Sequence, residues 1–167
     1  MTLNLPHSAA LLGKMAAPAK RIATVAHTHP DGDAIGSSLG MLHWLESLGK
    51  DARCIFPDRI SSNLAFMLDG RAKAKCLVYA DDAAAVRDWL AGCDLLIILD
   101  MNNCSRAAEM EDLLRAHKAP KVLIDHHLSP AAGEFSLVIS ETEISSASEL
   151  VYWLLEDLCL NGLGKLD

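Results

Sequence analysis

The stretch from His27 to Gly40 carries side chains that could do chemistry. It reads HTHPDGDAIGSSLG and places two histidines and two aspartates within seven positions, directly before an apolar helical pattern. Imidazole and carboxylate groups together suit divalent cations of intermediate hardness, such as manganese, iron, cobalt and zinc. The stretch indicates a metal site, although residues 30–33 taken alone also fit an ordinary turn with Asp33 as a helix N-cap.

Two later segments end in residues of the same kind. Asp100 follows the apolar run Leu95 to Leu99, and Asp125, His126 and His127 follow the next apolar run. Because ligands of parallel sheets collect beyond the carboxyl ends of the strands, three strand ends would deliver ligand-type side chains to one edge. A carboxylate between two histidine-bearing loops could bridge two ions about 3.5–4 Å apart, the spacing that suits phosphoryl displacement. Asp100 alone also fits a strand-end cap, but the three ends together favour a site.

The elements that must position these residues alternate along the chain. Short β-branched or apolar runs predict strands over 21–26, 52–56, 75–79, 94–99, 121–124 and 136–139. Helical spacing of apolar residues predicts helices over 34–48, 61–68, 82–91, 106–117 and 146–160. The last helix would bury Leu150, Trp153, Leu154 and Leu158. This alternation predicts an α/β fold of three layers, with a mainly parallel β-sheet and helices on both faces.

Length and composition limit the class of protein. With 167 residues, 51% of them hydrophobic, the chain is long enough for one well-buried domain, which we expect over 21–167 after an N-terminal helical segment over 1–20. A net charge of −7 argues against binding a long nucleic-acid duplex by electrostatic attraction. Apolar runs such as Leu95 to Leu99 are far too short to cross a bilayer, so we expect no membrane contact. The five widely spaced cysteines suit reduced thiols and a cytoplasmic protein.

Together the polar segments resemble the first three motifs of the DHH phosphoesterase superfamily. These motifs are HTHPDGDAIGS from His27, the apolar strand ending in Asp100 with Ser105-Arg106 downstream, and Asp125-His126-His127. The similarity runs from about residue 21 to residue 160. It is strongest to the bacterial oligoribonuclease and pAp-phosphatase branch, which is related to RecJ exonucleases.

The resemblance implies two manganese ions at the predicted edge. His27, Asp31 and Asp100 would hold one ion. Asp33, Asp100 and His126 would hold the other, so that Asp100 is shared. Other divalent cations are compatible with the same ligands. Two such ions imply metal-dependent hydrolysis of a phosphate ester.

Three more residues acquire roles from the resemblance. His127 would face the substrate phosphate, Asp125 would orient its neighbours, and Arg106 would support the phosphate or the loop after the second motif. The N–H groups of residues 35–37, where a helix is expected to begin, would offer an additional anion seat. The sequence departs from the family pattern at Asn102-Asn103, where the family often has a further aspartate.

The resemblance also implies a substrate class. We expect hydrolysis of phosphate esters of nucleotides or short oligoribonucleotides, as by an oligoribonuclease or pAp phosphatase. Alternatives are a pyrophosphatase, an exopolyphosphatase or a cyclic-dinucleotide phosphodiesterase of the same superfamily, and a non-catalytic metal- or nucleotide-binding module. Family members continue into a fourth motif and a smaller substrate-binding domain, and we expect the given sequence to end before both. We therefore expect an N-terminal DHH domain with impaired activity when alone. The sequence does not decide the oligomeric state, and a homodimer is compatible with it.

Overall fold

Six parallel strands form the centre of the structure, a computed structural model that describes residues 4–68 and 70–165. The strands are β1 (Arg21–Val25), β2 (Asp51–Phe56), β3 (Cys76–Val78), β4 (Leu95–Leu99), β5 (Lys121–Asp125) and β6 (Leu137–Ser140). Their order is β3-β2-β1-β4-β5-β6, and every neighbouring pair is parallel. The predicted strands are confirmed, with bounds that differ by about one residue.

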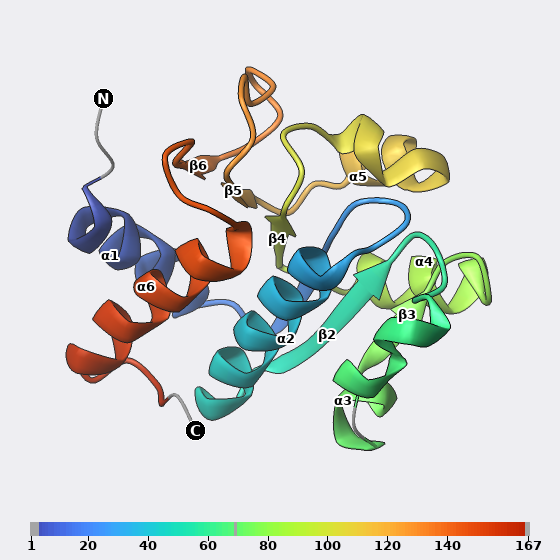
Figure 1. Cartoon of the computed structure of the whole chain (residues 1–167), viewed down its shortest axis with the longest axis horizontal. Coiled ribbons are helices and arrows are strands. Elements are labelled where there is room, and N and C mark those ends of the chain that lie inside the picture. Colours follow the sequence, from blue (N-terminus) through green and yellow to red (C-terminus); the bar gives the residue numbers. More distant parts are fainter. Residues whose placement is uncertain (1–3, 69, 166–167) are drawn as a thin grey trace.

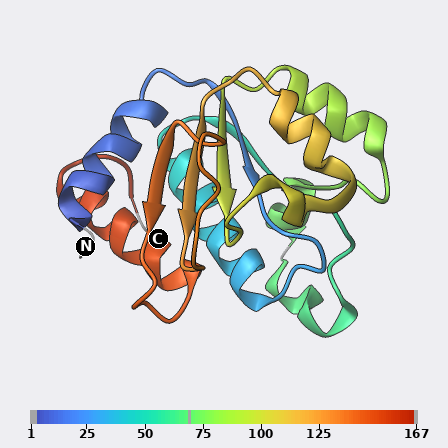
Figure 2. The same cartoon turned by 90° about the horizontal axis from the view of Figure 1, so that it is seen from above.

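Helices cover both faces of the sheet, which confirms the predicted three-layer α/β fold (Figure 1, Figure 2). One face carries α1 (Leu5–Ala16), α2 (Gly32–Ser47) and α6 (Ala147–Leu160), and the other carries α4 (Ala83–Ala91) and α5 (Glu111–Ala116). Shorter pieces are α3 (Gly70–Ala74) and the 3₁₀ helices η1 (Ser62–Met67) and η2 (Cys104–Met110). In the described part of the chain, no helix is long and apolar enough to cross a membrane.

The side chains of each strand alternate between two apolar cores. In β4, Leu95, Ile97 and Leu99 pack in the core shared with α1, α2 and α6, whereas Leu96 and Ile98 pack in the core shared with α4 and α5. This follows because successive side chains of a strand point to opposite faces of the sheet. Every residue of β4 is buried, as expected of a central strand covered on both sides.

The strand order creates a switch point between β1 and β4. From β1 the chain adds β2 and β3 on one side, and it then returns to add β4, β5 and β6 on the other side. The loops that leave β1 and β4 therefore diverge at the carboxyl ends of these two strands. Open α/β sheets bind ligands at this position.

The helix predicted over 106–117 is wrong in its first half. Ala108 has φ 48° and ψ −119°, which is not helical, and it forms a kink inside η2 before α5 begins at Glu111. A tertiary bond accounts for the break, because the carbonyl of Arg106 turns to accept a hydrogen bond from the N–H of Thr28, 2.8 Å away. Periodicity within one segment contains no information about such a partner.

The predicted burial of Trp153 on α6 is also wrong. Leu150, Leu154 and Leu158 are buried as predicted, but Trp153 is 41% exposed. Its indole N–H donates to Glu149 on the same helix. Other apolar residues of α6 complete the buried stripe, so the indole is left at the border, where a polar tip reaches solvent.

Helix α1 belongs to the core of the sheet rather than to a separate unit. Ala9, Leu12 and Ala16 are completely buried in the cluster that contains Trp44 and Leu158. Residues 1–3, at the start of the predicted segment 1–20, and residues 166–167, at the end of the predicted domain 21–167, lie outside the described residues.

Replacing Leu12 by Ala should therefore lower the free energy of unfolding by about 2–5 kcal/mol, because it leaves a cavity in the core. Leu160→Ala is the matched control, since Leu160 is 83% exposed at the end of α6 and should change stability by about 0.5 kcal/mol or less. Denaturant titration of both variants measures the difference. Equal stability of the two variants would contradict the packing of α1.

Candidate metal centre

Three strand ends meet at the switch point. His27 lies just beyond β1, Asp100 directly follows β4, and Asp125 ends β5. Because β4 pairs with β1 on one side and with β5 on the other, Asp100 lies between the two histidine-bearing loops. Its side chain is only 3% exposed.

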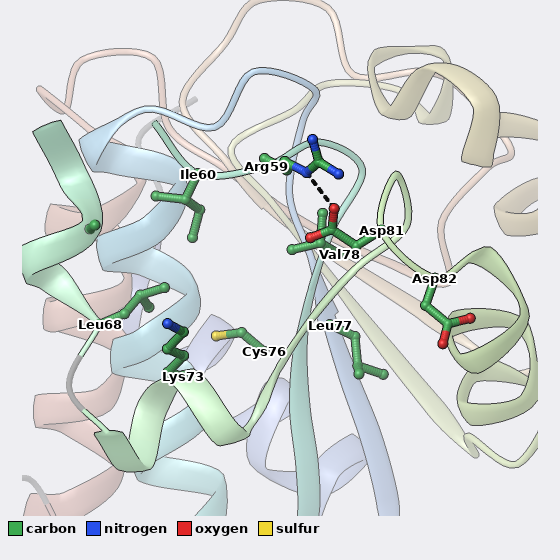
Figure 3. A pocket seen from close by; sticks show the side chains of 10 residues that line it. Arg59, Ile60, Leu68, Lys73, Cys76, Leu77, Val78, Asp81 and Asp82 are labelled. Atoms are coloured by element: carbon green, nitrogen blue, oxygen red, sulfur yellow. Dashed lines mark hydrogen bonds and ion pairs between the residues drawn. The ribbon is translucent and has the colours of Figure 1, made fainter. Parts of the chain in front are cut away.

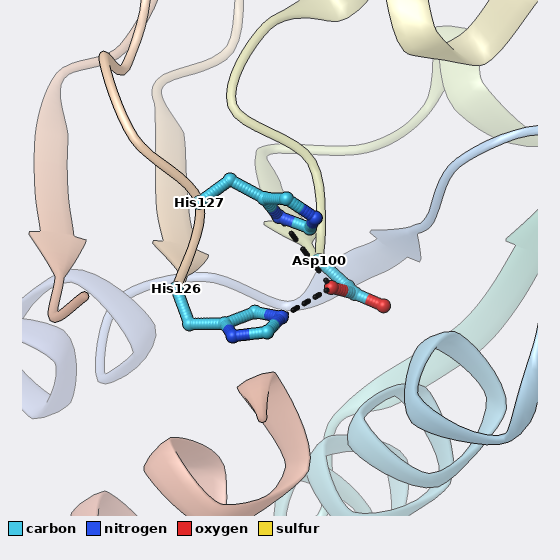
Figure 4. A group of neighbouring side chains, drawn as sticks. All are labelled: Asp100, His126 and His127. Atoms are coloured by element: carbon cyan, nitrogen blue, oxygen red, sulfur yellow. Dashed lines mark ion pairs between the residues drawn. The ribbon is translucent and has the colours of Figure 1, made fainter. Parts of the chain in front are cut away.

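The two oxygens of Asp100 face different histidines. Oδ2 is 3.3 Å from Nε2 of His27, and Oδ1 is 3.4 Å from Nε2 of His126 and 3.7 Å from Nδ1 of His127. Figure 4 shows the imidazoles of His126 and His127 converging on this carboxylate. Oδ1 is buried and accepts no hydrogen bond from any residue in 4–68 or 70–165. A buried, unpartnered carboxylate oxygen is costly, so this donor set fits a bound cation.

The backbone of Asp100 is in the left-handed region, with φ 55°. Its N–H donates to the carbonyl of Ile124 on β5, 3.1 Å away, so the residue is held at the sheet as the chain turns. Asp and Asn adopt this conformation more readily than most residues with a Cβ. Unfavourable backbone conformations of this kind cluster at functional sites.

The first predicted set of ligands comes together at the end of β1. Nδ1 of His27 is 2.6 Å from the carbonyl of Thr28, and because a carbonyl only accepts, Nδ1 must carry a proton. Nε2 is then directed to Asp100 and lies 3.9 Å from Oδ1 of Asp31. His27, Asp31 and Asp100 offer ligand atoms that all lie within 4.8 Å of one another.

The start of α2 differs from the prediction. The N-cap is Asp31 and not Asp33, because Oδ1 of Asp31 accepts from the N–H groups of Asp33 and Ala34 at 2.9 and 3.0 Å. The helix begins at Gly32, and the N–H of Ile35 donates to the carbonyl of Asp31. Residues 35–37 thus lie inside the helix, and the predicted anion seat there is wrong.

The second predicted set of ligands is also within contact distance, with one complication. Nε2 of His126 is 3.6 Å from Oδ2 of Asp33 and 3.4 Å from Oδ1 of Asp100. The Asp33 carboxylate, however, also accepts hydrogen bonds from the first turn of α6. The compact group on this side consists of Asp100, His126 and His127, without Asp33.

A completely buried carboxylate orients His127. Nδ1 of His127 is 2.7 Å from Oδ1 of Asp125, whose side chain is 0% exposed. An ionised carboxylate only accepts, so Nδ1 carries the proton and Nε2 remains for another partner. Oδ2 of Asp125 is buried and has no hydrogen-bond partner among the described residues.

Arg106 contacts the site through its backbone. Its carbonyl accepts from the N–H of Thr28, which holds the loop that carries His27. The side chain is half-buried, and within the described residues it forms no ion pair. The structure therefore gives Arg106 a place beside the loop but no contact of its guanidinium with the predicted ligands.

Sequence reasoning missed Asp58, which lies just after β2. Its Oδ2 accepts from the hydroxyl of Thr28 and from the N–H of His29, the latter at 2.9 Å. The hydrogen bond from Thr28 is the main cause that lowers the pKa of Asp58. The sequence does contain a signal for Asp58, because it is a carboxylate just beyond the predicted strand over 52–56, and the carboxyl ends of strands are where ligands collect.

A cavity of about 480 Å³ lies elsewhere, beside the edge strand β3 (Figure 3). Its wall is formed by apolar residues such as Ile60, Leu68 and Leu77, together with Lys73 and the ion-paired Arg59. None of the predicted metal ligands lines it. This cavity and the predicted metal ligands therefore lie at different places in the structure.

Comparisons with known proteins show the family of this chain. The family described as DHH family, N-terminal domain, matches residues 21–165. An exopolyphosphatase-related protein from Bacteroides fragilis shares 35% sequence identity with a TM-score of 0.84, over 94% of this chain and 44% of that one. The chain thus spans less than half the length of this relative. No match was found among curated proteins.

Two further solved structures resemble the fold alone. The exonuclease RecJ bound to manganese is 20% identical with a TM-score of 0.58, over 96% of this chain and 39% of that one. Sir2Af2 bound to a myristoylated histone peptide is 11% identical with a TM-score of 0.54, over 95% and 98% of the two chains.

Asp100→Asn should abolish tight manganese binding and leave the fold intact. Asn tolerates the left-handed backbone at this position, so the change removes the charge without adding backbone strain. Calorimetric titration with manganese and thermal unfolding of the metal-free variant test this. Unchanged affinity would show that Asp100 is not a ligand.

The binding of manganese should strengthen as the pH rises through the pKa of His27. The hydrogen bond to Asp100 raises that pKa above 6.5, against the opposing effect of burial. Protonated His27 therefore stabilises the metal-free fold below about pH 6.5, and this contribution is lost as the pH rises through the raised pKa. Because a histidine must be neutral to bind a metal, protons compete with manganese for His27 at low pH. Titration of the His27 ring by NMR, with Asp100→Asn as control, measures the shift. A ring that titrates alike in both chains would refute this cause.

Proposed function

The chain belongs to the DHH family, whose members are metal-dependent phosphohydrolases, and from this premise we propose that it hydrolyses phosphate esters of nucleotides or short oligoribonucleotides. The observation that carries the proposal is the shared carboxylate of Asp100. One of its oxygens faces His27 and the other faces His126. This is the arrangement that a bridging ligand between two cations requires.

The residues present fit two manganese ions. We assign His27, Asp31 and Asp100 to one ion, and Asp33, Asp100 and His126 to the other. When bound, the ions would activate a water molecule and neutralise charge that develops on the phosphate oxygens. The unpartnered Oδ1 of Asp100 supports the assignment, because a cation would compensate it. The manganese named with the RecJ structure belongs to that protein and supports the choice of metal for this one.

His127 is the group that we assign to the substrate. Its Nδ1–H is held by Asp125, so the ring is fixed, Nε2 has no hydrogen-bond partner in residues 4–68 and 70–165, and the side chain is 33% exposed. In the imidazolium form Nε2–H can donate to a phosphate oxygen or to the leaving oxygen, and the buried charge of Asp125 compensates the ring. Arg106 supports the loop of the first motif through its carbonyl.

The substrate class rests on the family and on charge. A net charge of −7 leaves little electrostatic attraction for a long duplex, which favours a short or mononucleotide substrate bound through its phosphate. Exopolyphosphatase activity is the second candidate, because the name of the 35% identical relative refers to it.

The free cysteines among the described residues favour a cytoplasmic protein.

A hydrolysis assay tests the proposed function. The chain is incubated with manganese and with pAp, a short oligoribonucleotide, pyrophosphate or polyphosphate, and a chelator is the control. We expect manganese-dependent release of phosphate or mononucleotide from the first two substrates. Slow rates are expected, because the chain spans less than half of its 35% identical relative. Turnover of polyphosphate alone would select the second candidate, and manganese binding without any turnover would favour a binding module.

The adjacent histidines should separate in this assay. His126→Ala should weaken manganese binding, because it removes a ligand, whereas His127→Ala should leave manganese binding within about twofold and lower turnover by roughly 10²-fold or more. Calorimetry and initial rates on both variants measure the two effects. Equal loss of metal in both variants would reject the division of roles.

A further inference from the structure

The start of α6 lies against the start of α2, and Asp33 is the residue that joins them. Its carboxylate accepts two backbone hydrogen bonds from α6, Oδ2 from the N–H of Ala147 at 2.8 Å and Oδ1 from the N–H of Ser148 at 2.7 Å. The hydroxyl of Ser148 donates to the backbone carbonyl of Asp33 at 3.0 Å. Ser148 alone thus makes two of the three bonds, one to the side chain and one to the main chain of Asp33.

Gly36 makes this close approach feasible. A Cβ added at Gly36 would lie 2.9 Å from Oγ of Ser148, so a larger residue would displace this hydroxyl from its place beside Asp33. Gly36 belongs to the first motif but carries no chemical group. Its place in the motif is explained by the space that Ser148 needs to reach Asp33.

The same carboxylate faces the metal centre. Oδ2 of Asp33 is 3.6 Å from Nε2 of His126, and a carboxylate oxygen that accepts one backbone bond retains a further lone pair for a cation. With both oxygens held by main-chain donors, the carboxylate has lost its free rotation before any ion arrives. Partners of this kind, which orient a ligand without touching the metal, commonly change metal affinity by 10–100-fold.

We propose that the start of α6 is a positioning element for the ion held on the Asp33 side, with Ser148 and the backbone of Ala147 fixing the carboxylate of Asp33 toward His126. The inference rests on the proposed function, since it requires that Asp33 and His126 share a cation. Neither Ser148 nor Ala147 is among the residues assigned as ligands. Because coupling between two events is reciprocal, occupancy of that site also stabilises the docking of α6 on α2.

Manganese affinity of Ser148→Ala, measured by calorimetry on the metal-free chain, tests the proposal. We expect this variant to bind the ion on the Asp33 side about 10-fold more weakly, because it loses the bond from the Ser148 hydroxyl, one of the three that join the two helix starts. Ser146→Ala is the matched control. Ser146 caps the same helix through the N–H of Glu149 at 3.0 Å, and among the described residues it forms no hydrogen bond with Asp33. Its removal therefore weakens the helix but leaves the three bonds to Asp33 in place, so manganese affinity should not change.

A second variant removes the donor of Ala147. Proline is accepted at the first position of a helix, so Ala147→Pro keeps a helix start while deleting the N–H that binds Oδ2 of Asp33. The control is Ala83→Pro at the first position of α4, on the other face of the sheet. We expect weaker manganese binding in the first variant and unchanged binding in the second, and thermal unfolding of both metal-free chains reports whether they fold.

A double-mutant cycle with His126→Ala isolates the positioning role. In a chain that already lacks His126, Ser148→Ala should cause a much smaller further loss of manganese affinity, because the ion on the Asp33 side has already lost its histidine ligand. Three results would overturn the inference without affecting the proposed metal centre. Ser148→Ala could lower manganese affinity equally with and without His126, or Ser146→Ala could lower it as much as Ser148→Ala does. The third result is unchanged manganese affinity in both Ser148→Ala and Ala147→Pro. Absence of manganese binding in the unmodified chain would instead overturn the proposed function.

Discussion

The arrangement of the candidate metal centre depends on one buried carboxylate, that of Asp100, whose charge must be compensated. The side chain of Asp100 is 3% exposed, and its Oδ1 has no hydrogen bond within the described residues. A charge in that position is costly unless an opposite charge compensates it. The strand order places one histidine-bearing loop on each side of it, and a cation between these groups would supply the compensation. The other features of the site, including the turn at Asp100 and the bonds that hold the loop of His27, serve to keep these groups in place.

The ligands are held largely by backbone groups. Asp31 caps α2, and Asp33 accepts from the first turn of α6, so two predicted ligands also satisfy N–H groups at helix starts. Asp125 holds His127, and the carbonyl of Thr28 holds His27. The turn-and-cap interpretation of the first motif and the metal interpretation are therefore compatible, because a carboxylate oxygen has more than one lone pair. Backbone donors move less than long side chains, which suits ligands that must be oriented before an ion binds.

Three elements depart from the sequence expectations, for two kinds of reason. The helix over 106–117 is interrupted where the carbonyl of Arg106 accepts a hydrogen bond from the N–H of Thr28, a partner far away in the chain. The other two departures are local, because other residues of α6 fill the buried stripe beside Trp153, and Asp31 caps α2 through the N–H groups of Asp33 and Ala34. Asp58 is a different case, since it is a carboxylate that follows a predicted strand, and the sequence alone contains that signal.

The sequence by itself determined the strands, their parallel direction and the residues that follow them, because periods of 2 and 3.6 residues are local and strand ends of a parallel sheet share one edge. Only the tertiary structure decided which ends are neighbours. It placed β4 between β1 and β5, which makes Asp100 the common residue, and it brought the N–H of Ala147 to Asp33, 114 positions earlier in the chain. A local period contains no record of these partners, since strand order and helix docking are settled by packing across the whole sheet.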